Sequence, residues 1–385
     1  MIRAAVAASC LLWLQATPAA DGDRPPRKLS GTPAEFPAPF SIIRSVLGLP
    51  DGRLVVSDPE ENRLVLLDFA KGTSVTLGRT GQGPREYRKV GGLYRARGGG
   101  VLVYDQSLRR LLPVSATGEV TDVVALPVPG SSSGSTNRGP DPYMSDSLGD
   151  AAGGSLFVIG EAKTIPLLRY RPGRVVDTVA HLLRAPHKIV EQTAHSVRTQ
   201  EVLFAPQDSW VLAPDGRIAV VHASPYQVEW IPLTGPVLRG PVIGYKPVSV
   251  TQADKDAMAS GSAELPGRQN TGLHIGPGGS PPPPAGAGDP RAKNELLFAE
   301  VKSPIRSGFG HWPLLDEGGR LWVERSLPAA VKTSMFDIFD RGGNLVERIE
   351  IPAGVHLIGV DARWIYTVRV DADDFEHLQR YPSPR

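Results

Sequence analysis

The fold class follows from two neighbouring runs, Gly52-Arg53-Leu54-Val55-Val56-Ser57-Asp58 and Asn62-Arg63-Leu64-Val65-Leu66-Leu67-Asp68. Each run is rich in branched apolar residues, and a short polar stretch separates them, which is the pattern of two adjoining β-strands. The pair recurs 47 residues later, as Gly99-Gly100-Val101-Leu102-Val103-Tyr104-Asp105 followed by Arg110-Leu111-Leu112. A strand pair that returns at such an interval indicates one structural unit used several times.

Weaker copies of the first run extend this repeat along the chain. They begin at Gly154, Gly216, Gly319 and Ala362. The six copies are therefore separated by 47, 55, 62, 103 and 43 residues. A period of about 40 to 50 residues with several strands per unit is typical of a β-propeller. We predict an all-β chain folded as a six-bladed β-propeller.

Each blade is expected to contain four strands. In the first blade these strands cover residues 41–49, 53–57, 63–69 and 74–77, and the last blade has only three, at residues 355–360, 364–370 and 376–381. We expect an N-terminal strand within residues 27–33 to close the last blade, because closure removes open sheet edges. Many runs are apolar on both faces, which predicts blades packed face to face and a buried Trp322.

The long interval before Gly319 contains an insertion, which we place at residues 249–303. Thr251 and Asp254 have the spacing of a capping box and predict a short helix through Met258. Asp289-Pro290 predicts a second helix that runs to about Val301. Residues 261–288 are rich in Gly, Pro and Ser, so we expect a dispensable surface loop. A functional lid is the alternative, although a linker is the commoner case.

Residues 2–20 have the composition of a secretory signal peptide. One cation precedes a short apolar run, and small residues and Pro18 follow. The apolar run is shorter than the roughly 20 residues that span a bilayer, so we expect no transmembrane segment. We assign residues 1–20 as the signal and 21–385 as one domain, located in the periplasm or secreted. Cys10 is the single cysteine of the chain, so the mature protein is expected to hold together by packing alone.

The composition excludes some classes of partner. The 385 residues include 42 Lys and Arg against 40 Asp and Glu, so no basic surplus is present to neutralise a nucleic acid backbone. The 42 Gly and 37 Pro interrupt the backbone often and disfavour long helices. We expect a monomer that binds no nucleic acid.

The segment between the first two units carries a resemblance to a known family. Gly78-Arg79-Thr80-Gly81-Gln82-Gly83-Pro84-Arg85-Glu86-Tyr87 resembles the G-x-G-P-G-E-F junction of bacterial exported six-bladed β-propellers related to NHL-repeat proteins, with Arg85 where the motif has Gly. Val56-Ser57-Asp58 with Asn62-Arg63-Leu64 is similar to the V-x-D-x-x-N-x-R-I strand pair of that family. The resemblance implies the fold. We take Arg79, Arg85 and Glu86 as candidates for contact with an anionic ligand, although turn geometry also explains the motif.

His311 and His356 are a second pair of candidate ligand-binding residues. Both fall at the start of an expected inner strand in adjacent units, so they are expected to face the mouth of the central channel. The other inner strands offer Arg44, Tyr94 and Ser145 in comparable places. Two histidines without a third ligand are poor zinc chemistry. We therefore predict polar channel-lining residues and no bound metal.

Three other patterns lack the context that their chemistry needs. Residues 130–134 match G-x-S-x-G but lack the strand and helix of a nucleophile elbow. His187, Glu191 and His195 are spaced by four, as zinc ligands on a helix often are, but their polar neighbours indicate a solvated face. Residues 371–374 resemble the start of a calcium loop but lack its Gly and its final Glu, so we interpret them as a charged hairpin turn.

The sequence therefore predicts an exported binding or interaction module for a protein, a glycan or a small molecule. No catalytic residue, metal ligand or cofactor is assigned. The alternative is a metal-dependent propeller enzyme of the lyase or lactonase kind, with its metal in the channel near His311 and His356. The fold by itself does not choose between the two, because propellers carry both kinds of function.

Overall fold

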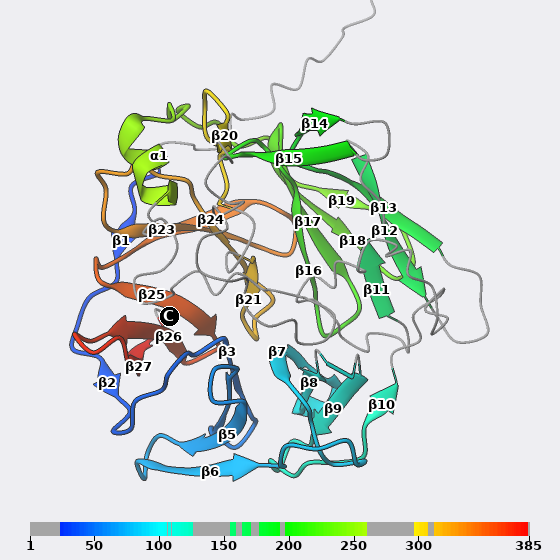
Figure 1. Ribbon diagram of the computed structural model, residues 1–385, viewed down its shortest axis with the longest axis vertical. Helices are drawn as coiled ribbons and strands as arrows, with labels where there is room; N and C mark the ends of the chain where they lie inside the picture. The colour runs from blue at the N-terminus through cyan, green and yellow to red at the C-terminus, as the bar shows by residue number, and fades with distance from the viewer. Residues whose placement is uncertain are drawn as a thin grey trace, which may run out of the picture.

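The chain is nearly all β in the computed structural model (Figure 1). The structure describes residues 24–105, 107–108, 110–125, 155–158, 164–170, 177–192, 197–259, 296–306 and 312–383. These residues contain one α-helix, α1 (Gln252–Ala259), and one turn of 3-10 helix, η1 (Arg97–Gly99). Across this described part, no helix has the length and apolar character to cross a membrane. The all-β class predicted from the sequence is confirmed.

The described strands form a series of small sheets with consecutive strands side by side. The first is β3 (Ser45–Gly48), β4 (Leu54–Asp58), β5 (Arg63–Asp68) and β6 (Thr73–Leu77), and the second is β7 (Val90–Arg95), β8 (Val101–Asp105), β9 (Arg110–Val114) and β10 (Val124–Ala125). Next come β11 (Ser155–Val158), β12 (Thr164–Tyr170) and β13 (Asp177–Leu183), and then β16 (Ser209–Leu212), β17 (Ile218–Ala223), β18 (Tyr226–Ile231) and β19 (Leu238–Arg239). The strand boundaries of the first unit match those expected to within a few residues.

Two further sheets are formed near the C-terminus, and each gains a strand from the N-terminal part of the chain. One consists of β21 (Leu314–Leu315), β22 (Leu321–Glu324), β23 (Ser334–Phe339) and β24 (Leu345–Ile351), with β1 (Arg27–Lys28) at its edge. The other consists of β25 (Val355–Val360), β26 (Trp364–Val370) and β27 (Glu376–Pro382), with β2 (Ala34–Glu35) at its edge. Figure 1 shows the blue N-terminal strands beside the orange and red C-terminal sheets.

The Gly-Arg pairs of the sequence repeat have a common structural role in the turns between the first two strands of a sheet. Gly52, Gly216 and Gly319 have φ values of 87°, 89° and 76°, a conformation that favours glycine. The Arg that follows each glycine donates its backbone N–H to a nearby carboxylate, in the pairs Arg53 to Asp51 (3.0 Å), Arg217 to Asp215 (3.1 Å) and Arg320 to Asp316 (2.9 Å). The guanidinium Nε binds the other carboxylate oxygen in each case. The repeat therefore encodes one turn built several times.

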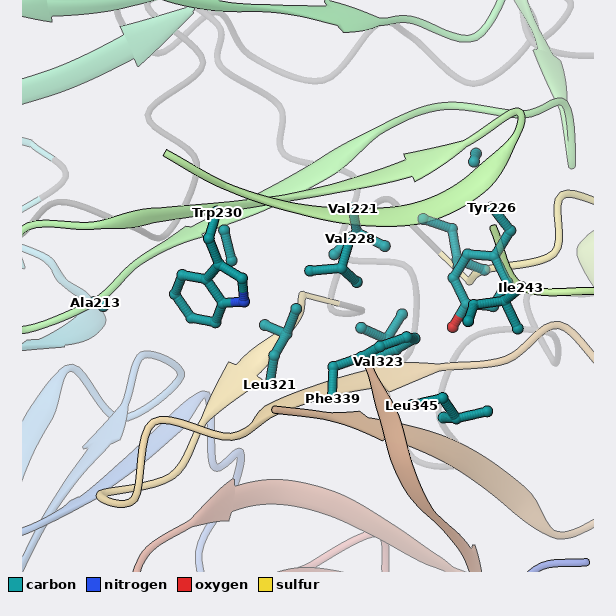
Figure 2. Close-up of a cluster of buried hydrophobic side chains, with 13 residues drawn as sticks. Ala213, Val221, Tyr226, Val228, Trp230, Ile243, Leu321, Val323, Phe339 and Leu345 are labelled. Atoms are coloured by element: carbon teal, nitrogen blue, oxygen red, sulfur yellow. The ribbon is translucent and has the colours of Figure 1, made fainter. Parts of the chain in front are cut away.

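The core consists of side chains between neighbouring sheets. Figure 2 shows one such layer, in which Trp230 and Val228 from β18 face Leu321 and Phe339 from β22 and β23. A similar layer joins β22–β24 to β25–β27 and contains Trp322, which is fully buried as predicted. Further layers join the first sheet to the second and to the last. Small antiparallel sheets packed face to face in succession are the plan of a β-propeller.

The expected position of the closing strand was wrong by a few residues. Ala34 and Glu35 pair with Arg380 and Gln379 of β27, whereas Arg27 and Lys28 run parallel to β24 in the preceding sheet. The physical reason lies just after β2, where Phe36 and Phe40 are buried between the last sheet and the first. These aromatic side chains fix which part of the N-terminal segment meets β27.

The insertion also differs from its prediction. The capping box at Thr251 and Asp254 is confirmed, because Thr251 N–H donates to the Asp254 carboxylate and Asp254 N–H donates to Thr251 Oγ1. The second helix does not reach Val301, since β20 (Leu297–Phe298) pairs with β15 (Val197–Leu203) and Phe298 stacks on Phe204 at 6.0 Å. His187 lies on a strand, β14 (His187–Gln192), and not on a helix. Residues 130–134, Ser145, His195, residues 261–288 and the expected helix start at residues 289–290 lie outside the described residues.

Candidate functional site

The junction loop, which we define as residues 78–89 between β6 and β7, borders an open depression on the surface. The depression has a volume of about 420 Å³ and is lined by Gly78, Arg79, Pro84, Arg85 and Glu86. Three of these five residues are the sequence candidates Arg79, Arg85 and Glu86. The structure therefore brings those three candidates together at one surface feature.

The backbone of the junction loop folds back on itself. Gly81 N–H donates to Tyr87 O at 2.9 Å, and Tyr87 N–H donates to Arg79 O at 3.1 Å. At Gly81 an added Cβ would lie 2.0 Å from Glu86 Oε2, so any other residue would displace the Glu86 side chain. The glycine of the motif therefore lets Glu86 keep its hydrogen bonds to Gly83 and Arg79.

Arg110, at the start of β9, holds the loop from one side. Its guanidinium donates to three loop carbonyls, those of Gln82 (3.0 Å), Gly83 (3.1 Å) and Glu86 (2.9 Å). The side chain is mostly buried and also lies 3.5 Å from the buried carboxylate of Asp105. One cation thus fixes three backbone groups, which makes the loop rigid at this end.

Asn62 and Tyr87 anchor the loop to the first sheet. The Asn62 amide donates to Thr80 Oγ1 and to Arg88 O, both at 3.1 Å, and its oxygen accepts the Val90 N–H at 2.9 Å. The Tyr87 ring is 1% exposed, and its hydroxyl accepts the Leu64 N–H at 3.2 Å. The half-buried Asn62 and the buried Tyr87 thus tie the loop to the first sheet at several points.

The charged side chains of the depression are arranged in two ion pairs. Arg79 Nε donates to Glu86 Oε1 at 2.6 Å, while Arg85 Nε donates to Asp122 Oδ1 at 2.9 Å. The Gly83 N–H, which Glu86 Oε2 accepts at 2.8 Å, and then the Arg79 guanidinium lower the pKa of the Glu86 carboxyl. Glu86 is therefore ionised at neutral pH and serves as an acceptor that orients Arg79.

Both arginines nevertheless lie in water. The side chain of Arg79 is 82% exposed and that of Arg85 is 69% exposed, whereas the side chain of Glu86 is only 19% exposed. The site thus has a fixed, partly buried carboxylate and two accessible guanidinium groups. Accessible guanidinium groups attract anions.

Of the two histidine candidates, His356 is on β25, opposite Val368 of β26, and is half-buried. His311 lies outside the described residues. Of the other inner-strand residues, Tyr94 is buried in a small cluster with Leu102 and Leu111. Within the described part of the chain, no group of three or more His, Cys, Asp or Glu side chains is placed to hold a metal ion.

Sequence reasoning missed the residues that hold the junction loop in place. In the sequence, Arg110 stands out only as a repeat position, Asn62 only in the repeat and the strand-pair motif, and Asp105 only as the end of a strand. A signal was available, since both Asn62 and Arg110 follow an aspartate that ends a strand of the repeat. The charged turn at residues 371–374 is confirmed, because Asp371 accepts the N–H groups of Asp373 and Phe375 within the β26–β27 hairpin.

Comparisons with known proteins give similarity at the level of structure only. No protein-family model matches the chain, and no curated protein sequence matches it. Among solved structures, a putative exported protein from Bacteroides fragilis has 10% identity and a TM-score of 0.45, covering 92% of this chain and 95% of that one. A member of the DUF4221 family from Bacteroides vulgatus has 9% identity and a TM-score of 0.42, covering 92% and 98%. Virginiamycin B lyase from Staphylococcus aureus has 10% identity and a TM-score of 0.38, covering 92% and 99%.

Proposed function

We propose that this protein is an exported binding module built on a six-bladed, NHL-like β-propeller, with its ligand held at the junction loop. The observation that carries this proposal is the construction of the loop. Arg110, Asn62 and Tyr87 hold its backbone from two sheets, while Arg79 and Arg85 remain exposed beside a depression of about 420 Å³. A rigid concave surface with accessible polar groups loses little conformational freedom when it binds.

Six blades are supported by the packing between sheets. Continuous core layers join β3–β6, β7–β10, β16–β19, β21–β24 and β25–β27 to a neighbouring sheet, and another layer joins β12–β13 to β16–β18. The sheet of β14, β15 and β20 packs instead on a small cluster of its own around Ala185 and Val202. We therefore assign that sheet to an insertion and not to a blade. An experimental structure with five or seven blades around the channel would contradict this assignment.

Export is supported by the signal-like composition of residues 1–20. The test is N-terminal sequencing of the protein recovered from the periplasm or the medium. A new N-terminus between residues 17 and 21 supports export, whereas a chain that keeps residues 1–15 inside the cell contradicts it.

The binding function is tested on the purified protein with a panel of neutral sugars, acidic sugars, peptides and small acids. A ligand present at 100 times its dissociation constant should raise the free energy of unfolding by about 2.7 kcal/mol. Hydrogen exchange should then show protection of residues 78–87. Binding that protects another surface and leaves this loop unchanged would place the site elsewhere.

A metal-dependent enzyme is the alternative to the binding module, and the metal content of the purified protein separates the two. Elemental analysis of the dialysed protein should find no stoichiometric zinc or calcium if the binding module is correct. Metal that survives dialysis and is lost in His311→Ala or His356→Ala would overturn the binding module in favour of the lyase or lactonase class. Retention of the melting temperature in a chelator would agree with the binding module.

A further inference from the structure

The two exposed arginines of the junction loop are each held by one nitrogen. Arg79 and Arg85 use Nε for Glu86 and Asp122, and no other hydrogen bond of either guanidinium to a described residue is present. The terminal nitrogens Nη1 and Nη2 of both side chains are therefore available on the solvent side. The carboxylates orient the guanidinium groups without using up their donors.

A guanidinium held in this way is suited to an oxyanion. Its terminal nitrogens form a planar fork that donates two parallel hydrogen bonds to a carboxylate, sulfate or phosphate group. A lysine in the same place would supply charge without the fork. The presence of arginine at both positions, each oriented through Nε, therefore points to recognition of an oxygen anion and not only to solubility.

The charges of the junction loop also favour an oxygen anion. The junction loop contains four cations, Arg79, Arg85, Arg88 and Lys89, and the last two are also exposed. Arg79 is paired with Glu86 of the loop, and Arg85 is paired with Asp122 outside it. The nearby Arg110 and Asp105 balance one another. With Asp122 counted, the loop still has two more positive than negative charges, which favours the approach of an anion.

The loop is also ordered in advance. Arg110 fixes three of its carbonyls, and Asn62 fixes both of its ends through Thr80, Arg88 and Val90. Glu86 is fixed through the Gly83 N–H. An incoming anion would need to order only the outer ends of two side chains that are already tethered, so less binding free energy is lost to ordering.

We propose that the junction loop binds a ligand carrying carboxylate, sulfate or phosphate groups, through Nη1 and Nη2 of Arg79 and Arg85. This inference rests on the proposed binding function and adds the chemical class of the ligand. The shared chemistry is an oxyanion that accepts paired N–H donors.

Calorimetric titrations of the purified protein with inorganic phosphate, sulfate and trigalacturonate distinguish the three sources. We expect at least one probe to bind, with an affinity that falls as salt is added. Arg79→Ala/Arg85→Ala should lower that affinity about tenfold or more, because charge-assisted hydrogen bonds are lost. Arg79→Lys/Arg85→Lys keeps the charge and should also bind more weakly than the wild type, since the fork is lost.

Lys71→Ala/Arg341→Ala is the matched control, since it also removes two exposed cations but lies outside the junction loop. The affinity of this control variant for the probe should stay within about twofold of the wild type.

Arginine side-chain NMR on the wild-type protein gives a reading that does not depend on a variant folding, and the signals of Arg79 and Arg85 should shift during the titration. Absence of binding by all three probes, or equal affinity in Arg79→Ala/Arg85→Ala, overturns the inference. A neutral ligand that protects residues 78–87 while all three probes fail would overturn the oxyanion inference and keep the binding module.

Discussion

At the scale of single residues, His222 shows how one side chain links two sheets. It lies at the end of β17 with Nδ1 2.9 Å from Asp208 Oδ2 and Nε2 3.3 Å from Glu229 Oε2. Asp208 in turn accepts the backbone N–H of Leu183, at the end of β13. Arg239 lies 2.8 Å from Glu229 on the other side. The Asp208 carboxylate, outweighing the burial of the ring and assisted by Glu229, raises the pKa of His222.

This raised pKa predicts a pH dependence of stability. Folding favours the protonated imidazole, so its stabilising contribution is complete below about pH 6.5 and is lost as the pH rises through the folded-state pKa. We expect this contribution to the free energy of unfolding to fall as the pH rises above about 6.5, and His222→Gln to remove most of that fall. Urea unfolding of both proteins at each pH is the measurement. An identical pH dependence in wild type and His222→Gln would contradict the prediction.

Trp322 is the residue for which the core predicts a large energetic cost. Its side chain is 0% exposed between β22–β24 and β25–β27. Trp322→Ala should lower the free energy of unfolding by about 3 to 5 kcal/mol, because a large cavity is left between two sheets. Tyr245→Ala, at a side chain that is 37% exposed, should cost less than about 1 kcal/mol. Equal effects of the two changes would mean that Trp322 is not part of a packed layer.

At the scale of elements, the helix α1 is held by one buried ion pair. Lys302 Nζ lies 2.5 Å from Asp254 Oδ1 and donates to Leu327 O at 2.7 Å, and both charged side chains are less than a tenth exposed. Burial pushes the pKa of Asp254 up, but Lys302 and the Thr251 cap outweigh this effect, so the net pKa is lowered. The carboxylate therefore depends on its partners to remain ionised.

Lys302→Met should release α1 from the sheets. The change leaves the Asp254 carboxylate buried without its cation, and breaking a buried pair from one side costs about 3 to 5 kcal/mol. Hydrogen exchange of residues 252–259 should therefore quicken. The double variant Asp254→Asn/Lys302→Met removes both charges and should recover part of the protection. If α1 exchanged equally in all three proteins, the ion pair would not be what holds it.

At the scale of the whole molecule, the N-terminal segment joins the last sheet to the first. Phe36 and Phe40 are 1% and 2% exposed within a layer shared by β2, β27 and the first sheet. Phe36→Ala should lower the free energy of unfolding by about 3 to 5 kcal/mol and expose the edge of β27 to hydrogen exchange. Arg27→Ala breaks only a half-exposed pair with Glu347 and should cost less than about 1 kcal/mol. The reverse ranking would return the closing role to residues 27–33.

The repeating strand pattern, the turns at each Gly-Arg pair and the cap of α1 can all be predicted from the amino-acid sequence. These features depend on neighbours within a few residues, through strand alternation, glycine conformation and local side-chain hydrogen bonds. The sequence also indicates Arg79, Arg85 and Glu86. Three features depend instead on long-range packing: β2 and not residues 27–33 closes the last sheet, β20 pairs with β15, and Arg110 and Asn62 fix the junction loop. Those contacts join residues 26 to 346 positions apart, and they depend on which aromatic and charged side chains meet when the sheets pack.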